Sequence, residues 1–541
     1  MNKHFTIEFS FKTNIVSKWQ KSIENHMLPF LFGLLTAISI IYFINYLQNG
    51  LGLSYNDARS HLDIGRRVVE GLKPGLAQLG SVWLPLPHLL MVPTIWNDFM
   101  WHSGLAGALQ SMVSYVATSL LIYLFLRQLG VGMWGRLVGV GIFAANLNVL
   151  YLQATAMTEL LLIATLTAGS YELVMWHKED KVLRLIRSAF WVMLASLVRY
   201  EGWFLLLYSL ALITIHVWRK KGYKVTEGTL ILFGTLAAFG IALWFLWNTL
   251  IFKDPFYFAF GPFSARSQQR QLETAGVLAT KGDLVLSLKV YLYALIYNSY
   301  ALQAILGLCG AFVLWLDKKI PLSVRIASTV LISPFLFNIL ALYLGHSVLF
   351  IQGISGNTWF NVRYGVMMLP SIAIFVGFLI DRMKDLRITL IGLMLFVTFF
   401  AFANSDAVTI DDARVGSSQK NVSEVSGYLN QHAKDKKGFI LISAASHDAI
   451  IFSSGLPMKR FIHEGTGAYW ESATTSPDRW ARWIVARTYD DNDLTWKAVS
   501  KVPTFLERYD LVSKYPFADI YMLKDEFSGD LVTEPVLGKQ K

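Results

Sequence analysis

Cysteine is almost absent from this 541-residue sequence, and charged residues are scarce. Cys309, the only cysteine, lies inside an apolar run, which excludes both an intramolecular disulfide and a zinc site built from cysteines. Only 16% of the residues are charged, whereas soluble domains usually carry about 25%. The deficit is concentrated in residues 28–404, so this region is not the core of a water-soluble domain.

The N-terminus lacks the features of a cleavable signal peptide. Residues 1–24 are polar and of mixed charge, and the first apolar run, 28–48, is longer than the hydrophobic region of a signal peptide. We therefore expect a cytoplasmic N-terminal segment, 1–27, followed by a retained first helix.

Apolar runs of transmembrane length recur between residues 28 and 404. The stretch 188–218 is too long for one helix, and Arg199-Tyr200-Glu201-Gly202 interrupts it. The sequence predicts a polytopic α-helical membrane protein with about eleven spans, at 28–48, 104–126, 136–152, 158–176, 188–199, 203–218, 227–251, 289–315, 322–344, 362–380 and 387–404.

Lysine and arginine lie mainly in short connections between these runs. The formal net charge of +11 would suit nucleic-acid binding, but this placement is the one by which membrane proteins orient themselves. We expect a multi-pass cell-membrane protein with no nucleic-acid partner. With residue 1 in the cytoplasm, the long connections and the tail are external, at 49–103, 252–288, 345–361 and 405–541.

The tail, residues 405–541, has the composition of a separate soluble module. Strand-like runs at 439–443, 483–487 and 519–523 alternate with helix-like segments near 446–454 and 495–508. This pattern predicts a small α/β domain. No Gly-rich phosphate loop accompanies His447-Asp448, so we expect a structural or acceptor-recognition domain.

The first external connection, 49–103, contains many of the chemically active side chains. If the chain is helical from Ser54 or Asn56, Asp57 and His61 lie on one face at i, i+4. Asp57 is equally suited to cap a helix N-terminus. Loose spacing argues against a divalent metal bound by the acidic and histidine residues of this connection, which are Asp57, His61, Asp63, His88 and Asp98.

The segment 81–93 is apolar and contains three prolines, Pro85, Pro87 and Pro93. We expect that it does not form an ordinary helix. Because it is apolar, with Trp83 and Trp96 nearby, the segment is predicted to lie in the membrane interface, either bordering a groove for a lipid substrate or serving as an anchor.

Motifs along 28–404 resemble those of the GT-C superfamily of membrane glycosyltransferases. Protein O-mannosyltransferases (glycosyltransferase family 39) and the lipid A aminoarabinose transferases belong to it. The motifs are Asp57 just beyond the first span, Thr158-Glu159 opening the fourth, the turn Val198–Trp203, Asp254-Pro255-Phe256, and Asn361-Val362-Arg363-Tyr364 with Pro370 beyond. The resemblance implies an active site at the external membrane face and an inverting transfer from a polyprenyl-phosphate-linked sugar.

By this resemblance Asp57 is the general base that takes the proton of the acceptor hydroxyl. An inverting transfer needs such a carboxylate. The leaving phosphate departs as a stable anion and needs positive charge, for which Arg363 is the first candidate because guanidinium binds phosphate in a bidentate way. The other expected substrate-binding residues are Arg199, Glu201, His61, Arg59, Tyr364, Glu159 and His88.

The sequence departs from the protein mannosyltransferases because Ala58, not an acidic residue, follows Asp57. The acceptor therefore stays open between protein, glycan and lipid. A polytopic transporter or lipid flippase is the main alternative. It would explain the spans, but not a long first loop carrying Asp57 or an external soluble domain, and it would favour charges at mid-membrane and broken helices. A non-catalytic assembly or receptor subunit is a third hypothesis.

Overall fold

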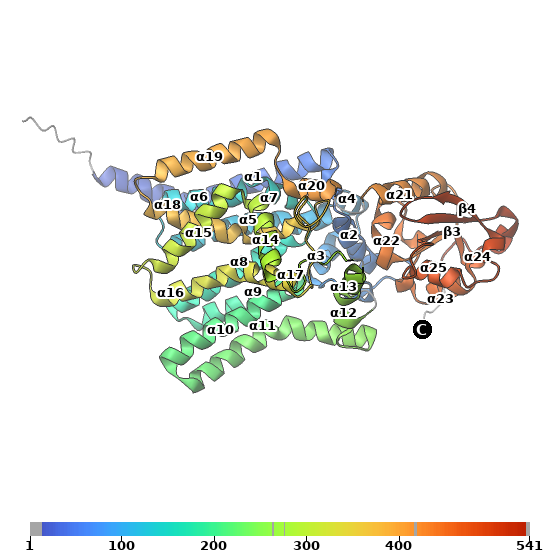
Figure 1. Cartoon of the computed structure of the whole chain (residues 1–541), viewed down its shortest axis with the longest axis horizontal. Coiled ribbons are helices and arrows are strands. Elements are labelled where there is room, and N and C mark those ends of the chain that lie inside the picture. Colours follow the sequence, from blue (N-terminus) through green and yellow to red (C-terminus); the bar gives the residue numbers. More distant parts are fainter. Residues whose placement is uncertain (1–12, 262–263, 275, 416–418, 537–541) are drawn as a thin grey trace, which may run out of the picture.

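The computed structural model describes residues 13–261, 264–274, 276–415 and 419–536. Its long helices run along one axis as a bundle, and the C-terminal module lies beyond one end of that bundle (Figure 1). Helix α1 (Thr13–Gln48) continues into the predicted N-terminal segment 1–27, of which residues 1–12 lie outside the described residues.

The protein is a multi-pass helical membrane protein. Among the described residues, eight helices are long and apolar enough to cross a membrane, or nine if one bent pair is counted as a span. The eight are α1, α5 (Leu105–Gln128), α8 (Glu159–Glu179), α10 (Glu201–Lys221), α11 (Tyr223–Phe252), α16 to α17 (Leu322–Ala327 and Ser333–Tyr343), η4 with α18 (Val362–Met368 and Leu369–Arg382), and α19 (Arg387–Asn404).

Two of the predicted spans are shorter than a membrane crossing by themselves. The stretch 136–152 is divided between α6 (Met133–Ala144) and α7 (Leu147–Leu152). Helix α9 (Val182–Val198) has 17 residues. The predicted interruption at Arg199 is confirmed, because α9 ends at Val198 and α10 begins at Glu201.

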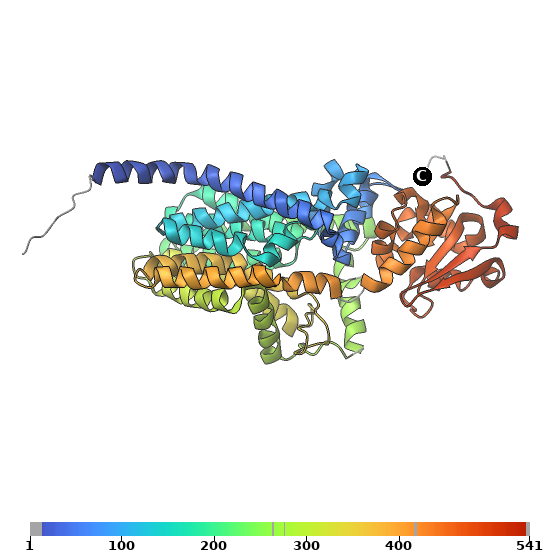
Figure 2. The same ribbon diagram turned by 90° about the horizontal axis from the view of Figure 1, so that it is seen from above.

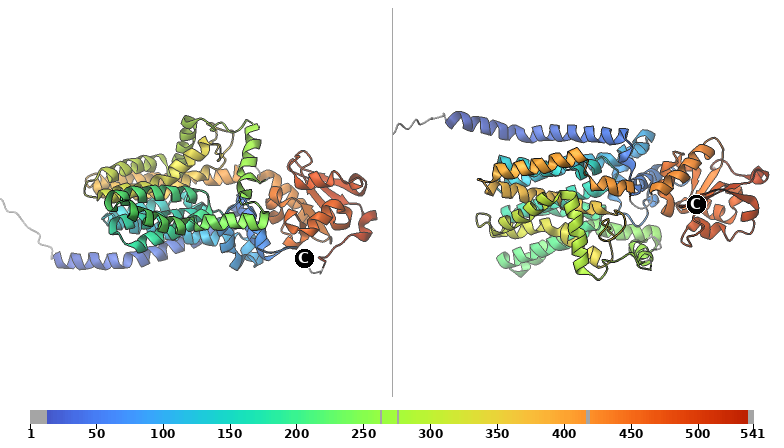
Figure 3. Two further views of the ribbon diagram at one scale, coloured as in Figure 1. Left: turned by 90° about the horizontal axis from the view of Figure 1, so that it is seen from below. Right: turned by 45° about the horizontal axis from the view of Figure 1, so that its top comes forward.

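The single helix predicted at 289–315 is wrong. Instead, α14 (Leu284–Ser299) and α15 (Ala301–Leu316) meet at an angle of 108°. Tyr300, at the corner, has a φ of 63°, which a right-handed helix does not accommodate. Helix α14 projects from one side of the bundle (Figure 2), and α13 (Ala265–Thr274) projects from the same side (Figure 3).

The first long connection folds as α2 (Asn56–Val69), η2 (Leu76–Leu79), α3 (Leu86–Ile95) and α4 (Asp98–His102). Helix α2 begins at Asn56, which is one of the two starting residues that the sequence predicted. The expectation that 81–93 contains no ordinary helix is wrong for its second half, which is α3. Pro87 is tolerated because it occupies the first turn, where backbone N–H groups have no intrahelical partner.

The C-terminal module contains a five-stranded sheet of order β2-β1-β3-β5-β4. The predicted strands β1 (Phe439–Ile442), β3 (Ala481–Ala486) and β5 (Asp519–Leu523) are confirmed. The edge strands β2 (Phe461–Ile462) and β4 (Tyr509–Lys514) were not predicted. Strand β1 is parallel to both neighbours, whereas β3, β5 and β4 pair antiparallel. Helices α22 (Ala444–Ser453), α25 (Leu494–Val499) and α26 (Phe505–Arg508) match the predicted helical segments.

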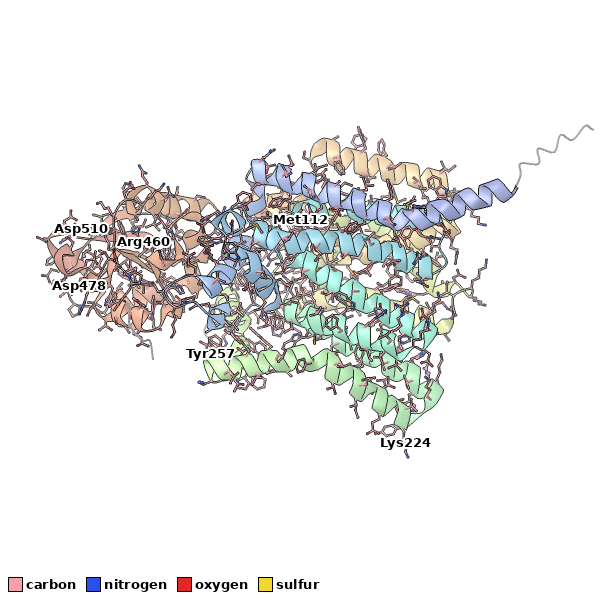
Figure 4. The ribbon with its side chains drawn as sticks, turned by 180° about the vertical axis from the view of Figure 1, so that it is seen from behind. Met112, Lys224, Tyr257, Arg460, Asp478 and Asp510 are labelled. Atoms are coloured by element: carbon pink, nitrogen blue, oxygen red, sulfur yellow. The ribbon has the colours of Figure 1, made fainter. Side chains whose placement is uncertain are left out.

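The first long connection and the C-terminal module contact each other at the same end of the bundle (Figure 1). Arg59 Nη1 donates to Ser453 Oγ at 3.1 Å, and Gln78 Nε2 donates to the carbonyl of Gly465 at 2.7 Å. Lys224, in the first turn of α11, lies at the other end of the bundle from Asp510 of the module (Figure 4). The predicted topology, including which end faces the cytoplasm, stays a prediction.

Candidate active site

Arg363 lies at the start of η4, and its guanidinium faces three carboxylates of the described chain. Nη2 donates to Asp57 Oδ2 at 2.6 Å, and Nε donates to Glu159 Oε1 at 2.9 Å. Nη1 lies 3.8 Å from Asp412 Oδ2. Only 6% of the Arg363 side chain is exposed. A buried guanidinium held by several charge-assisted contacts has a well-defined orientation.

Asp57 occupies the first turn of α2 and is the accessible carboxylate of this set. Its side chain is 44% exposed, whereas that of Glu159 is 0% exposed. Asp57 therefore combines a fixed contact to Arg363 with access to the adjacent cavity, which it lines. This is the geometry that a general base needs, because it has to reach the proton that it removes.

Arg199, in the turn between α9 and α10, adds a second positive charge. Its Nη1 lies 3.3 Å from Glu159 Oε1, and its Nε donates to Glu201 Oε1 at 3.1 Å. The guanidinium also lies 4.9 Å from the ring centroid of Tyr364. Burial alone would lower the pKa of Arg199, but Glu201, Tyr364 and Glu159 together raise it, so the guanidinium stays charged.

His61 follows Asp57 by one turn of α2 and belongs to a buried imidazole pair. Its Nδ1 lies 2.8 Å from Nε2 of His88, and the ring of Trp83 lies 4.3 Å from the His61 ring. Burial, assisted by Arg199 and Arg363, lowers the pKa of His61 to about 3. Burial also holds the pKa of His88 well below its usual range. Both rings are therefore neutral at physiological pH, and they can hydrogen-bond but not supply positive charge.

A cavity of about 1790 Å³ connects these residues to the C-terminal module. Ligand sites for small molecules usually enclose about 300–1,000 Å³. At one end the cavity is lined by Asp57, Arg363 and Arg199. The lining also includes apolar and aromatic side chains, among them Trp203 of α10 and Phe258 of α12 (Tyr257–Phe260). The space is large enough for a donor and an acceptor together.

Six of the nine predicted site residues line this cavity: Asp57, His61, Arg199, Glu201, Arg363 and Tyr364. Two more, Glu159 and His88, lie directly behind it and contact lining residues. Arg59 has a different place. It donates to the carbonyl of Leu53 at 2.8 Å and to Ser453, and so joins the first connection to α22, outside the described cavity lining.

The residues considered for a divalent metal have separate partners. Asp63 accepts from Trp101 Nε1 at 3.1 Å, and Asp98 accepts from Arg66 Nη2 at 2.6 Å. Within the described residues, no group of three or more His, Cys, Asp or Glu side chains is arranged to hold a metal ion. The donor set of the first connection therefore does not converge on one point.

Two residues of the site were missed by the sequence analysis, Tyr55 and Asp412. The Tyr55 hydroxyl donates to Asp412 Oδ2 at 3.1 Å, and its ring lies 4.8 Å from the Arg363 guanidinium carbon. Asp412 comes from α20 (Val408–Val415), which follows the last span. The only sequence signal for Asp412 was the adjacent acidic pair Asp411-Asp412. This pair lies in the tail, outside the residues 28–404 that carry the family resemblance.

The fold and the site together define the class of protein: a multi-pass helical membrane domain in which a carboxylate of the first long connection is held against an arginine of a late helix. No family model matches the sequence, and no curated protein matches it. Among solved structures, ArnT from Cupriavidus metallidurans bound to undecaprenyl phosphate has a TM-score of 0.50 at 11% identity, covering 91% of this chain and 99% of ArnT.

Archaeoglobus fulgidus oligosaccharyltransferase, in complex with Zn and sulfate, is also similar, with a TM-score of 0.49 at 11% identity over 90% of this chain and 72% of that protein. At these identities the likeness to ArnT establishes the fold and leaves the activity to be argued from the site.

Proposed function

We propose that the protein is a membrane glycosyltransferase that moves a sugar, with inversion, from a polyprenyl-phosphate-linked donor to an acceptor hydroxyl at the external membrane face. One observation carries the proposal: the exposed carboxylate of Asp57 lies 2.6 Å from the buried guanidinium of Arg363, on the wall of a cavity that continues into an apolar, aromatic surface. The fold that the chain shares with ArnT, a protein solved with undecaprenyl phosphate, supports the donor class.

In this mechanism Asp57 accepts the proton of the acceptor hydroxyl. The hydroxyl oxygen then forms a bond to the anomeric carbon from the face opposite the phosphate. The bond between the anomeric carbon and the phosphate oxygen breaks, and its electron pair leaves with the phosphate. Arg363 and Arg199 stabilise that departing charge, which removes the need for a strong general acid.

The contact between Asp57 and Arg363 also gives an order of binding. While Asp57 is paired with Arg363, its Oδ2 atom is occupied by the guanidinium. A donor phosphate that binds Arg363 competes with Asp57 for the same donors. Donor binding therefore releases the carboxylate, and the acceptor is deprotonated only when the donor is in place.

Glu159 and the apolar lining have supporting roles. Glu159 contacts both Arg363 and Arg199, so it compensates two buried cations and leaves their remaining donors for the phosphate. Trp203, Phe204 and Leu207 of α10, with Phe258 close by, offer the apolar surface that a polyprenyl chain requires next to membrane lipid. The bend between α14 and α15 is a broken helix of the kind that the transporter hypothesis would use, but that hypothesis assigns no role to Asp57.

The test replaces Asp57 with Asn in the full-length protein. In a host strain lacking the gene, we expect the variant to leave the sugar composition of the cell envelope at the level of the deletion strain, since loss of a general base lowers turnover by about 10²–10⁴-fold. The purified variant should still bind undecaprenyl phosphate. Asp98→Asn, which removes a carboxylate bonded to Arg66 instead, is the matched control and should restore the composition. Restoration by Asp57→Asn would show that Asp57 is not the base.

A further inference from the structure

The carboxyl ends of three strands in the C-terminal module form the wall of the cavity that faces the module. The segment after β1 contributes His447, the segment after β2 contributes Glu464, and the segment after β3 contributes Arg487. Phe517, from the connection between β4 and β5, completes this surface. We call these four residues the module wall.

The module wall lies at a reversal of strand order. From β1 the chain passes to β2 on one side of it, and from β2 it crosses to β3 on the other side, with β1 parallel to both. In open α/β sheets, ligands bind outside the carboxyl ends of the strands at such a switch point. The position of His447 and Arg487 is therefore that of a ligand site, and here it opens onto the cavity of Asp57.

His447 is held as a neutral hydrogen-bond acceptor. Its Nε2 donates to Asp493 Oδ2 at 2.7 Å, and Asp493 is itself fixed by the backbone N–H groups of Arg487 and Trp496. Burial lowers the pKa of His447 despite Asp493, while the bond from His447 outweighs burial and lowers the pKa of Asp493. The Nδ1 atom of His447 has no hydrogen-bond partner among the described residues. An unpaired buried acceptor is costly and favours a ligand that donates a hydrogen bond.

Glu464 and Arg487 restrict the class of that ligand. The Glu464 carboxylate accepts from the backbone N–H groups of Ala444 and Ala445, at 2.9 and 2.6 Å. The N-terminus of α22, where a phosphate would otherwise bind, is thus already filled by a carboxylate. The Arg487 guanidinium lies 4.0 Å from the ring centroid of Phe517. The wall therefore offers acceptors together with one guanidinium donor.

Hydroxyl groups suit this combination because each of them both donates and accepts a hydrogen bond. A peptide suits it less well. Peptides are commonly bound by adding a strand to a sheet edge, and the edge strands here are β2 and β4, whereas the cavity is lined by strand ends. We propose that the module wall binds the acceptor and that the acceptor is a saccharide. This inference rests on the proposed function, in which a hydroxyl of the bound saccharide reaches Asp57.

The experiment measures binding to the purified full-length protein without any donor. The probes are fluorescently labelled neutral oligosaccharides of glucose, mannose, galactose and N-acetylglucosamine, and a mixture of labelled peptides containing Ser, Thr and Asn. Arg487→Ala is the main variant, and His447→Gln, which keeps a donor for Asp493, is the second. Arg482→Ala is the matched control, because Arg482 lies on β3, the strand that leads to Arg487, and its guanidinium lies 5.9 Å from the Trp483 ring centroid, outside the described cavity lining.

We expect at least one oligosaccharide to bind the wild type and Arg482→Ala equally, and Arg487→Ala and His447→Gln about tenfold more weakly, as expected for the loss of one or two hydrogen bonds. Because no donor is present, this binding is measured separately from the transfer reaction. The inference is overturned if no oligosaccharide binds, if Arg487→Ala binds as well as Arg482→Ala, or if the peptides bind in an Arg487-dependent way. If Asp57→Asn transfers sugar normally while the oligosaccharide still needs Arg487, only the proposed mechanism fails.

Discussion

The two ends of the cavity differ in the charge state of their polar side chains. At the membrane end, Arg363 and Arg199 are kept charged by Glu159, Asp57 and Glu201. At the module wall, burial keeps the imidazole of His447 neutral beside an ionised carboxylate. The first arrangement suits a ligand with negative charge, and the second suits an uncharged ligand with hydroxyl groups. A transferase for a phosphate-linked donor and a sugar acceptor needs both.

The largest effect should come from removing the carboxylate that compensates both arginines. Glu159→Gln leaves the buried guanidinium of Arg363 and the half-buried guanidinium of Arg199 with one partner fewer each, and breaking a buried ion pair such as that of Arg363 costs about 3–5 kcal/mol. We expect a clear drop in the unfolding midpoint of the purified protein in detergent. Asp98→Asn, which removes a mostly exposed partner of Arg66, should change the free energy of unfolding by less than about 1 kcal/mol. Equal midpoints for the two variants would mean that the charges at the membrane end are not interdependent.

Arg363→Lys should weaken donor binding by about 10- to 100-fold. The ammonium group of lysine is a point charge and does not reproduce the fork that contacts Asp57 and Glu159 and remains available to a phosphate. The measurement is the dissociation constant for undecaprenyl phosphate. Arg59→Lys is the control, because Arg59 lies outside the described cavity lining, and it should bind the lipid as the wild type does. If Arg363→Lys has the same dissociation constant for undecaprenyl phosphate as the wild type, Arg363 does not bind the phosphate.

The neutral histidines should make the folded protein less stable in acid. The pKa of His61 is lowered to about 3 in the folded state and is about 6.5 when unfolded. Above pH 6.5 neither state is protonated and the full stability is present. As the pH falls below 6.5 only the unfolded state takes up the proton, so stability is lost, by about 2 kcal/mol at pH 5. The slope of the unfolding midpoint between pH 8 and pH 5 should be shallower for His61→Gln, and unchanged for a variant of the exposed His432. If His61→Gln leaves this slope unchanged, the loss of stability in acid comes from other titratable groups.

Much of the membrane domain was predictable because an apolar run of sufficient length has few alternatives to a membrane helix. The break at Arg199 and the start of α2 at Asn56 were also predictable from charged and capping residues. The corner at Tyr300 was not predictable. A non-glycine residue with a positive φ is held in that conformation by its surroundings, and no local sequence pattern indicates it. Helix α3 was missed because Pro85 and Pro87 were taken as helix breakers, although they lie at the N-cap and in the first turn, where proline is tolerated.

Asp57 and Arg363 could be predicted as site residues because each of them belongs to a motif of the family resemblance. Asp412 could not be predicted, because its place depends on the packing of α20 against a distant helix: the backbone N–H and hydroxyl of Thr409 donate to Asn148 Oδ1 of α7 at 3.0 and 2.9 Å. Such a contact joins residues 261 positions apart. The prediction that Arg59 lines the site failed for a related reason: its hydrogen-bond partner, Ser453, belongs to the C-terminal module.

The smallest expected effect concerns Tyr364, whose ring lies 4.9 Å from the Arg199 guanidinium carbon and 5.4 Å from that of Arg363. A cation near an aromatic face contributes about 0.5–2 kcal/mol. Tyr364→Leu should therefore weaken undecaprenyl phosphate binding by about fivefold, close to 1 kcal/mol, because both arginines lose the ring that holds them. Tyr364→Phe keeps the ring and should bind the lipid normally. If Phe and Leu weaken binding equally, the hydroxyl rather than the ring is the contributing group, and the membrane end then depends on hydrogen bonding as the module wall does.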